Sequence, residues 1–103
     1  MLFLKNILKW SDVIQNIKPD SLVFIYHTEC YHSTNLLNRI KHIDDIVYLN
    51  INANQDFDLN IQNIGKLTYV PILILILHNT VIDYTHNFED MKILYSQIPD
   101  RVF

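Results

Sequence analysis

The sequence is poor in glycine and cysteine. Its 103 residues include one glycine, Gly65, and one cysteine, Cys30. A single cysteine excludes an internal disulfide framework and a zinc site built from four cysteines, so the cytoplasm is the expected compartment. The longest apolar run, Val70 to Leu77, is far too short to span a membrane. The first residues lack the basic start and cleavage site of a signal peptide, and we expect no membrane partner.

Neither sign of charge is in large excess. The formal net charge is −3, from 8 basic and 11 acidic residues, so we expect no nucleic-acid partner. Half of the residues are apolar and 18% are charged, which excludes a disordered chain and suits a compact protein. At this length the whole chain, residues 1–103, is expected to form a single domain with its own core.

Continuous apolar runs predict buried strands. The run from Leu22 to Tyr26 is typical of a strand buried on both faces, and Ile72 to Leu77 form the clearest buried strand in the chain. Further strands are expected over 46–51 and 81–85. A turn at His78-Asn79-Thr80 joins the last two strands into a hairpin, although the glycine usual in such turns is missing.

Helical spacing of apolar residues separates these strands. We expect four helices: Trp10 to Ile17 with Ser11 or Asp12 as cap, Cys30 to about Lys41 or His42, a short helix carrying Phe57, Ile61 and Ile64 and closed by Gly65, and Phe88 to Ile98 capped by Asn87. Alternating helices and strands followed by a hairpin predict an α/β fold. Its expected form is a three-layer sandwich, with a mixed sheet of about four strands and helices on both faces.

Cys30 lies where the first buried strand gives way to a helix. Leu36, Leu37 and Ile40 follow Ser33 at helical spacing, so Cys30 stands at the start of that helix. A thiol at a helix N-terminus faces unpaired backbone N–H groups, which favour the thiolate. A buried, inert cysteine is the alternative, since free cysteines are often buried. Its position outside the apolar run favours an exposed, activated thiol.

The neighbours of Cys30 influence its thiol in different directions. Protonated His32 would favour the thiolate, Glu29 would oppose it, and the hydroxyl of Ser33 could donate a hydrogen bond to it. Each also has a plainer interpretation as a surface or first-turn residue. His27, Cys30 and His32 are poorly spaced for a metal site, so we expect no metal and no cofactor.

The order of these features resembles the thioredoxin superfamily over nearly the whole chain. The resemblance rests on a buried strand running into Cys30-Tyr31-His32-Ser33, on Ile64-Gly65, and on Val70-Pro71 ahead of the hairpin and last helix. It implies a thioredoxin-like fold with Cys30 as the nucleophile. It also implies a cis peptide at Val70-Pro71 that contacts substrate, together with Tyr31, beside Cys30.

Some positions depart from the superfamily pattern. Ser33 stands at the place of the resolving cysteine, Phe24 at that of a buried aspartate, and Glu29 at that of a tryptophan. The C-x-x-S form is similar to that of monothiol glutaredoxins and of the bacilliredoxin-like proteins of low-GC Gram-positive bacteria. The glutaredoxins carry a Gly-Gly segment that residues 83–90 lack, and Tyr31 replaces the proline of the bacilliredoxins.

The resemblance implies monothiol thiol–disulfide exchange. Cys30, aided by His32 and Ser33, would attack mixed disulfides of client proteins, and a low-molecular-weight thiol would then release it because Ser33 cannot. The alternative is a catalytically inactive binding module that uses the groove around Cys30 and Pro71. The missing second cysteine and Phe24 fit that alternative. A redox sensor with Cys30 as the oxidised switch is a third hypothesis.

Overall fold

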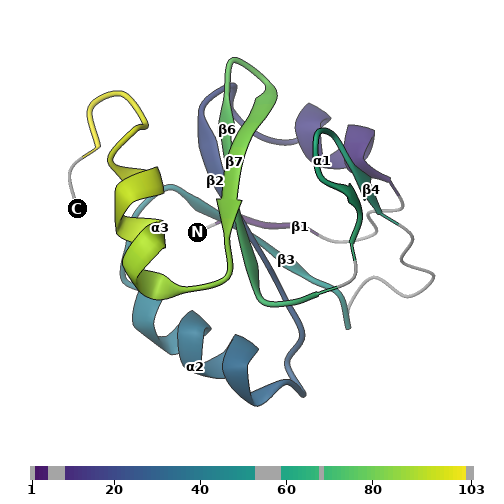
Figure 1. Ribbon diagram of the computed structural model, residues 1–103, viewed down its shortest axis with the longest axis vertical. Coiled ribbons are helices and arrows are strands. Elements are labelled where there is room, and N and C mark those ends of the chain that lie inside the picture. Colours follow the sequence, from purple (N-terminus) through teal and green to yellow (C-terminus); the bar gives the residue numbers. More distant parts are fainter. Residues whose placement is uncertain (1, 5–8, 53–58, 68, 102–103) are drawn as a thin grey trace.

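A computed structural model describes the chain except for residues 1, 5–8, 53–58, 68 and 102–103 (Figure 1). The elements in chain order are β1 (Leu2–Leu4), α1 (Trp10–Gln15), β2 (Ser21–Tyr26), α2 (Tyr31–Ile40), β3 (Ile46–Asn50), β4 (Asn60–Ile61), β5 (Gly65–Lys66), β6 (Ile72–Leu77), β7 (Thr80–Thr85) and α3 (Phe88–Tyr95). Five strands form one mixed sheet in the order β1-β3-β2-β6-β7. Within it β1, β3 and β2 are parallel, and β6 runs antiparallel to both β2 and β7.

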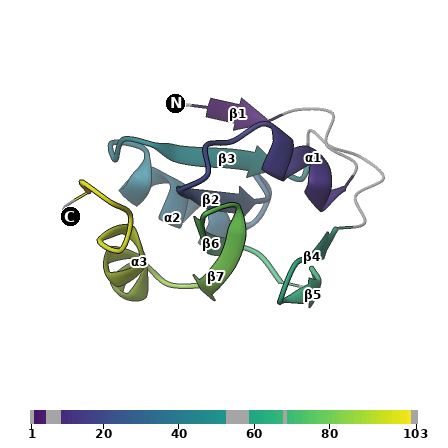
Figure 2. The same ribbon diagram turned by 90° about the horizontal axis from the view of Figure 1, so that it is seen from above.

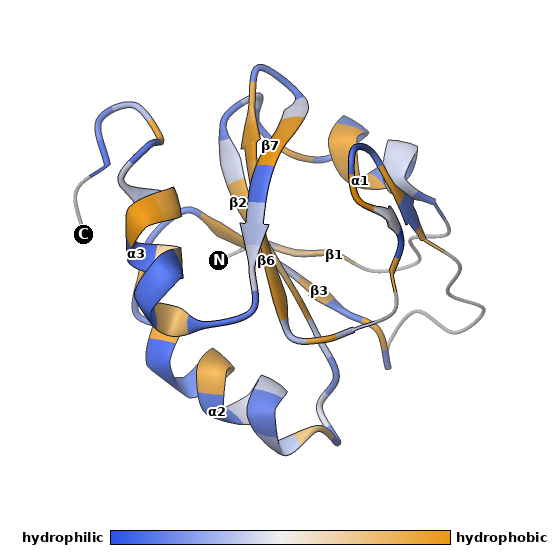
Figure 3. Cartoon of the chain, in the orientation of Figure 1, coloured by the Kyte–Doolittle hydropathy of each residue, from blue (hydrophilic) through white to orange (hydrophobic). Residues whose placement is uncertain are grey.

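Helices cover both faces of this sheet. Figure 1 shows α1 on one side and α2 with α3 on the other, and Figure 2 shows the sheet strands in the order β1-β3-β2-β6-β7. Val23 and Ile25 of β2 pack with Trp10 of α1, while the alternate residues, such as Phe24, pack in the cluster that includes α2 and α3. All six residues of β2 are buried, which explains its continuous apolar sequence. The apolar colouring in Figure 3 follows these central strands. The predicted α/β class with a mixed sheet is confirmed.

The strand count and one helix differ from the sequence-based expectation. The main sheet has five strands because β1 adds to its edge beside β3. The short helix expected around Ile61 and Ile64 is wrong in the described residues, where β4 and β5 form a small antiparallel hairpin. Leu59 and Ile61 are buried and Asn60 between them is exposed, a period of two. Gly65, with φ of 95°, begins β5 and closes no helix there. The expected member Phe57 lies outside the described residues.

The helix caps were predicted with mixed success. Asn87 caps α3 as expected, since its side-chain oxygen accepts from the Asp90 N–H at 2.8 Å. In α1 the cap position belongs to Lys9, and both Ser11 and Asp12 lie inside the helix. Asp12 still stabilises this end from within, because its carboxylate accepts from the Lys9 N–H at 3.2 Å.

The turn between β6 and β7 forms without glycine. His78 and Asn79 both adopt positive φ, 53° and 62°, which a two-residue hairpin of this kind requires. Hydrogen bonds from outside the hairpin hold them there. The His78 N–H donates to Asp20 Oδ1 and the Asn79 N–H to the Pro19 carbonyl, each at 2.9 Å.

The register of the sheet brings two loops to the same edge. Ile25 of β2 pairs with Ile72 of β6, so the carboxyl end of β2 lies beside the start of β6. The loop that carries Cys30 follows β2, and Pro71 directly precedes β6, so both lie at this edge of the sheet. Among the helices of the described ranges, none has the length and apolar character needed to cross a membrane.

Candidate functional site

A tight loop of residues 27–30 connects β2 to α2 and places Cys30 at the cap position of the helix. The Cys30 N–H donates to the His27 carbonyl at 3.0 Å, and the Cys30 carbonyl accepts from the Thr34 N–H at 3.0 Å. Cys30 itself has extended backbone angles, φ −92° and ψ 122°. Its thiol therefore stands at the N-terminus of a ten-residue helix, where backbone donors are unpaired.

The Cys30 thiol is partly exposed and its environment favours ionisation. Hydrogen bonding from the backbone N–H of Ser33 makes the largest contribution to lowering the pKa of this thiol, followed by the Ser33 hydroxyl. Burial opposes them, and the backbone N–H of His32 adds a smaller contribution that lowers the pKa. Within the described part of the chain, the side chain of Cys30 makes no capping hydrogen bond. The Ser33 and His32 donors favour the charged thiolate over the neutral thiol.

Ser33 is the buried partner of the thiol. Its side chain has no exposed surface, and its oxygen accepts from the His27 N–H at 3.2 Å. A hydroxyl has one proton to donate and two lone pairs. With a lone pair taken by His27, the hydroxyl proton is free to point to the sulfur. Ser33 thus links the loop before Cys30 to the helix after it.

The two residues between Cys30 and Ser33 face solvent. Tyr31 is 76% exposed, and its ring meets that of His32 edge-on at 5.8 Å between centroids. In the structure, His32 acts on the thiol through its backbone N–H. The expected effect of its imidazole, like the opposing effect of Glu29, stays a prediction.

The Val70-Pro71 peptide bond is cis. Pro71 is buried and Val70 is partly buried. The Pro71 carbonyl accepts a hydrogen bond of 2.7 Å from Nδ1 of His86, which places the imidazole proton on that nitrogen. The ring of Tyr69 packs edge-on against His86 at 4.7 Å, and 59% of Tyr69 is exposed. The site near Pro71 therefore presents aromatic side chains to solvent.

Sequence reasoning missed His86 as a neighbour of Pro71. A lone histidine after a strand carries no local signal of such a contact. The hairpin register does carry one, because Leu73 pairs with Thr85 and the next residues outward on each side lead to Pro71 and His86. An exact register is needed to use this signal, and an irregularity between Leu75 and Ile76 shifts the register within the hairpin.

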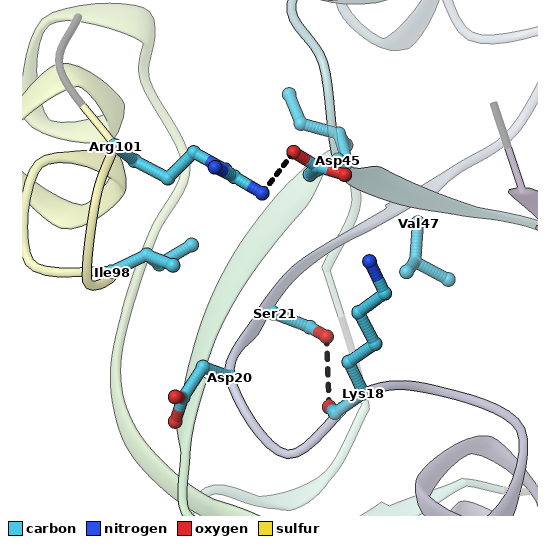
Figure 4. Close-up of a pocket in the computed structure, with 8 residues that line it drawn as sticks. Lys18, Asp20, Ser21, Asp45, Val47, Ile98 and Arg101 are labelled. Carbon is cyan, nitrogen blue, oxygen red and sulfur yellow. Dashed lines mark hydrogen bonds and ion pairs between the residues drawn. The ribbon is translucent and has the colours of Figure 1, made fainter.

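A cavity lies at the N-terminal end of β2, the end opposite to Cys30 (Figure 4). Its volume is about 300 Å³, and its lining comes from the segment before β2, the start of β3 and the chain after α3. Several of its polar groups are engaged within the protein: Arg101 pairs with Asp45, the Ser21 hydroxyl donates to the Lys18 carbonyl, and Asp20 accepts from the β6–β7 turn. The Nε of Arg101 is buried without a hydrogen-bond partner among the described residues. None of the predicted site residues lines it.

Metal-binding side chains do not converge in the part of the chain that the structure describes. There, no three histidine, cysteine, aspartate or glutamate side chains are grouped closely enough to hold an ion. His27, which the sequence analysis considered with Cys30 and His32 as a possible ligand, directs its ring to backbone and amide groups.

Comparison with known proteins bears on the fold. No protein-family model matches the chain, and no curated protein matches it. Among solved structures, thioredoxin f2 of Chlamydomonas reinhardtii is similar, with a TM-score of 0.58 and 15% sequence identity over 94% of each chain. An identity this low shows the fold alone. The chain therefore has a thioredoxin-like fold, as the resemblance of its sequence implied.

Proposed function

We propose that this thioredoxin-like fold carries out monothiol thiol–disulfide exchange, with Cys30 as the reacting sulfur. The observation that carries the proposal is the placement of Cys30: partly exposed, at the cap of α2, with the N–H and hydroxyl of Ser33 lowering its pKa. A thiolate is the nucleophile in disulfide exchange, so donors that favour it raise the fraction able to react. A serine at this position supports exchange while leaving the protein with one thiol.

The reaction proceeds in two exchanges. The Cys30 thiolate attacks the small-thiol sulfur of a mixed disulfide on a client protein, and the client cysteine leaves as a thiolate. Cys30 now carries the small thiol as a disulfide. A second low-molecular-weight thiolate attacks that small-thiol sulfur, which frees Cys30 and yields a small-molecule disulfide. Overall, one mixed disulfide and one free small thiol become one client thiol and one small-molecule disulfide, so atoms and electrons balance.

The surrounding residues have separate roles in this proposal. Ser33 stabilises the Cys30 thiolate, both when it attacks and when it leaves. His32 lies on the exposed first turn of α2, where its imidazole can supply a proton to the departing thiolate. Tyr31, Val70 and Pro71 form the substrate-binding surface, with Val70 as the backbone that an extended client peptide would pair with.

The test uses a model protein with one cysteine blocked as a mixed disulfide with glutathione. Wild-type protein with excess glutathione should release the model protein's thiol much faster than glutathione alone. Cys30→Ser should abolish the gain, and Lys41→Ala, an exposed position just after α2, should retain it. A wild-type protein no faster than free glutathione would contradict the proposal.

A binding module is the second candidate, and the exposed aromatics favour it. Tyr31 and Tyr69 present 76% and 59% of their surface to solvent, and a cavity of about 170 Å³ is lined in part by Tyr69 and His86. Aromatic side chains of this kind often anchor bound peptides. Under this hypothesis a client peptide binds Cys30→Ser as tightly as wild type. Under the exchange hypothesis, stable capture requires the sulfur.

A further inference from the structure

The imidazole of His27 lies at the centre of the loop that precedes Cys30. Its Nδ1 faces the Glu29 N–H at 3.1 Å, and its Nε2 faces Nδ2 of Asn52 at 3.1 Å. The main chain of His27 contacts both Ser33 and Cys30, since its N–H donates to the Ser33 hydroxyl oxygen and its carbonyl accepts from the Cys30 N–H. Ring and backbone of one residue thus connect the loop to β3 and to the helix.

The Thr28 N–H sets the orientation of the Asn52 side chain, the partner of the His27 ring just after β3. Oδ1 of Asn52 accepts from the Thr28 N–H at 2.6 Å, and a backbone N–H can only donate. The Asn52 amide nitrogen must therefore face His27. Asn52 is itself held through its N–H, which donates to Oδ1 of Asn50 at 2.9 Å. Both nitrogens of the His27 ring consequently meet donors.

The proton count of the ring then decides how many of these contacts are hydrogen bonds. A neutral imidazole has one lone pair, so it accepts either from the Glu29 N–H or from the Asn52 amide. An imidazolium has none and accepts from neither. Adding a proton to His27 therefore removes the last ring hydrogen bond that ties the loop together, and leaves donors facing donors.

We propose that His27 is a positioning residue whose neutral ring holds the loop of residues 27–30, and through it the Ser33 hydroxyl, in place around Cys30. This role rests on the proposed exchange function and deepens it, because it adds a proton-sensitive support to the same site. Protonation removes the one hydrogen bond that the neutral ring accepts, from the Glu29 N–H or from the Asn52 amide, and loosens the hydrogen bond between His27 and Ser33.

Several charged or titratable groups share this surface. Glu29 and Cys30 lie on the loop itself, His32 lies on the first turn of α2, and Asn50 and Asn52 on the β3 side are uncharged. An imidazolium at His27 would also attract the thiolate by its charge, against the effect of the lost support. Thiol reactivity alone would mix the two effects, so the test separates geometry from charge.

The first measurement is an NMR titration of the full chain between pH 5 and 8, the range in which histidines change charge. The amide signals of Thr28, Glu29 and Cys30 should shift with the same midpoint as the His27 ring. In His27→Asn, which keeps an acceptor near the position of Nδ1 and does not titrate, those shifts should disappear. His42→Asn, an exposed histidine after α2, is the matched control and should leave them unchanged.

The second measurement is the thiolate absorbance of Cys30 at a fixed pH where His27 is neutral and the thiol is only partly ionised. His27→Ala should lower the thiolate fraction by about two- to tenfold, the range for one lost hydrogen bond. His27→Asn should restore most of it. Thermal melts identify an Ala variant that fails to fold, and the Asn variant then decides the question.

Loop amides that ignore the ring titration, or an Asn variant no better than a folded Ala variant, would overturn the proposal. These outcomes differ from failure of the exchange function. A wild-type protein that does not reduce mixed disulfides could still show the coupled amide shifts, and a protein that reduces them could show none.

Discussion

Phe24 should be among the most costly side chains to truncate. It is fully buried in β2, the strand at the centre of the sheet. Its ring stacks on Tyr26 at 5.1 Å and meets Tyr48 edge-on at 6.1 Å. Its backbone is paired on both sides, with Tyr48 and with Leu73. The surroundings therefore cannot move inward to fill the space that the ring would leave.

The magnitude follows from this confinement. Truncating a buried phenylalanine costs ~3–5 kcal/mol through lost transfer free energy and the cavity left behind. We expect Phe24→Ala to lower the free energy of unfolding by that amount. Phe3 is the matched control, because its ring also stacks on Tyr48, at 5.0 Å, while 48% of the residue is exposed. Half of a buried phenylalanine's transfer free energy gives ~1 kcal/mol for Phe3→Ala.

Urea unfolding at equilibrium measures both values, with the slope against urea checked for constancy. A loss below ~1 kcal/mol for Phe24→Ala, or equal losses for the two variants, would refute the argument that burial in β2 and not ring stacking supplies the stability. A change of slope would mean that the unfolded or native state had altered, and the comparison would then rest on Phe24→Leu.

Three further outcomes are expected. Ser33→Ala should raise the pKa of Cys30 toward the free-thiol value and cost ~1–3 kcal/mol by leaving the His27 N–H without its acceptor, while Ser96→Ala on exposed surface should change neither thiol absorbance nor the urea midpoint appreciably. Asn87→Ala should destabilise the protein by ~1 kcal/mol in urea melts through loss of the α3 cap, and Asn87→Asp should retain it. Protein whose Cys30 carries glutathione should melt at a lower temperature than reduced protein at alkaline pH, and equal melting temperatures there would contradict the role given to the Ser33 donors.

The central elements could be predicted because their signals are local. The buried run of β2, the change of period after Cys30 and the long apolar run of β6 each identify an element without reference to the rest of the chain. The position of Cys30 at the start of α2 followed from two of them. The cis peptide before β6 came from a resemblance and had no local signal.

The remaining features depend on pairing between distant segments. β1 has three residues, too few to show a period, and it is a strand only because β3 lies beside it. Ile61 and Ile64 satisfy helical spacing, but Asn63 adopts φ of 66°, which makes the turn of a hairpin. The contact between His27 and Asn52 exists because β2 and β3 are parallel and end together, Tyr26 opposite Asn50. The polar residues His27 and Asn52, which follow these two adjacent parallel strands, were the sequence signal that could have predicted the contact.

The lowered pKa of Cys30 also determines which form of the protein the fold favours. A thiol whose pKa is lower when folded than when unfolded stabilises the native state. That stabilisation is complete above the free-thiol pKa of about 8.5 and is lost as the pH falls through the lower folded value. A mixed disulfide on Cys30 has no charge for the N–H and hydroxyl of Ser33 to stabilise. The folded protein therefore favours the reduced thiolate over the mixed disulfide. In the proposed reaction, this difference would favour release of Cys30 by a small thiol in the second exchange, where Ser33 cannot resolve the mixed disulfide.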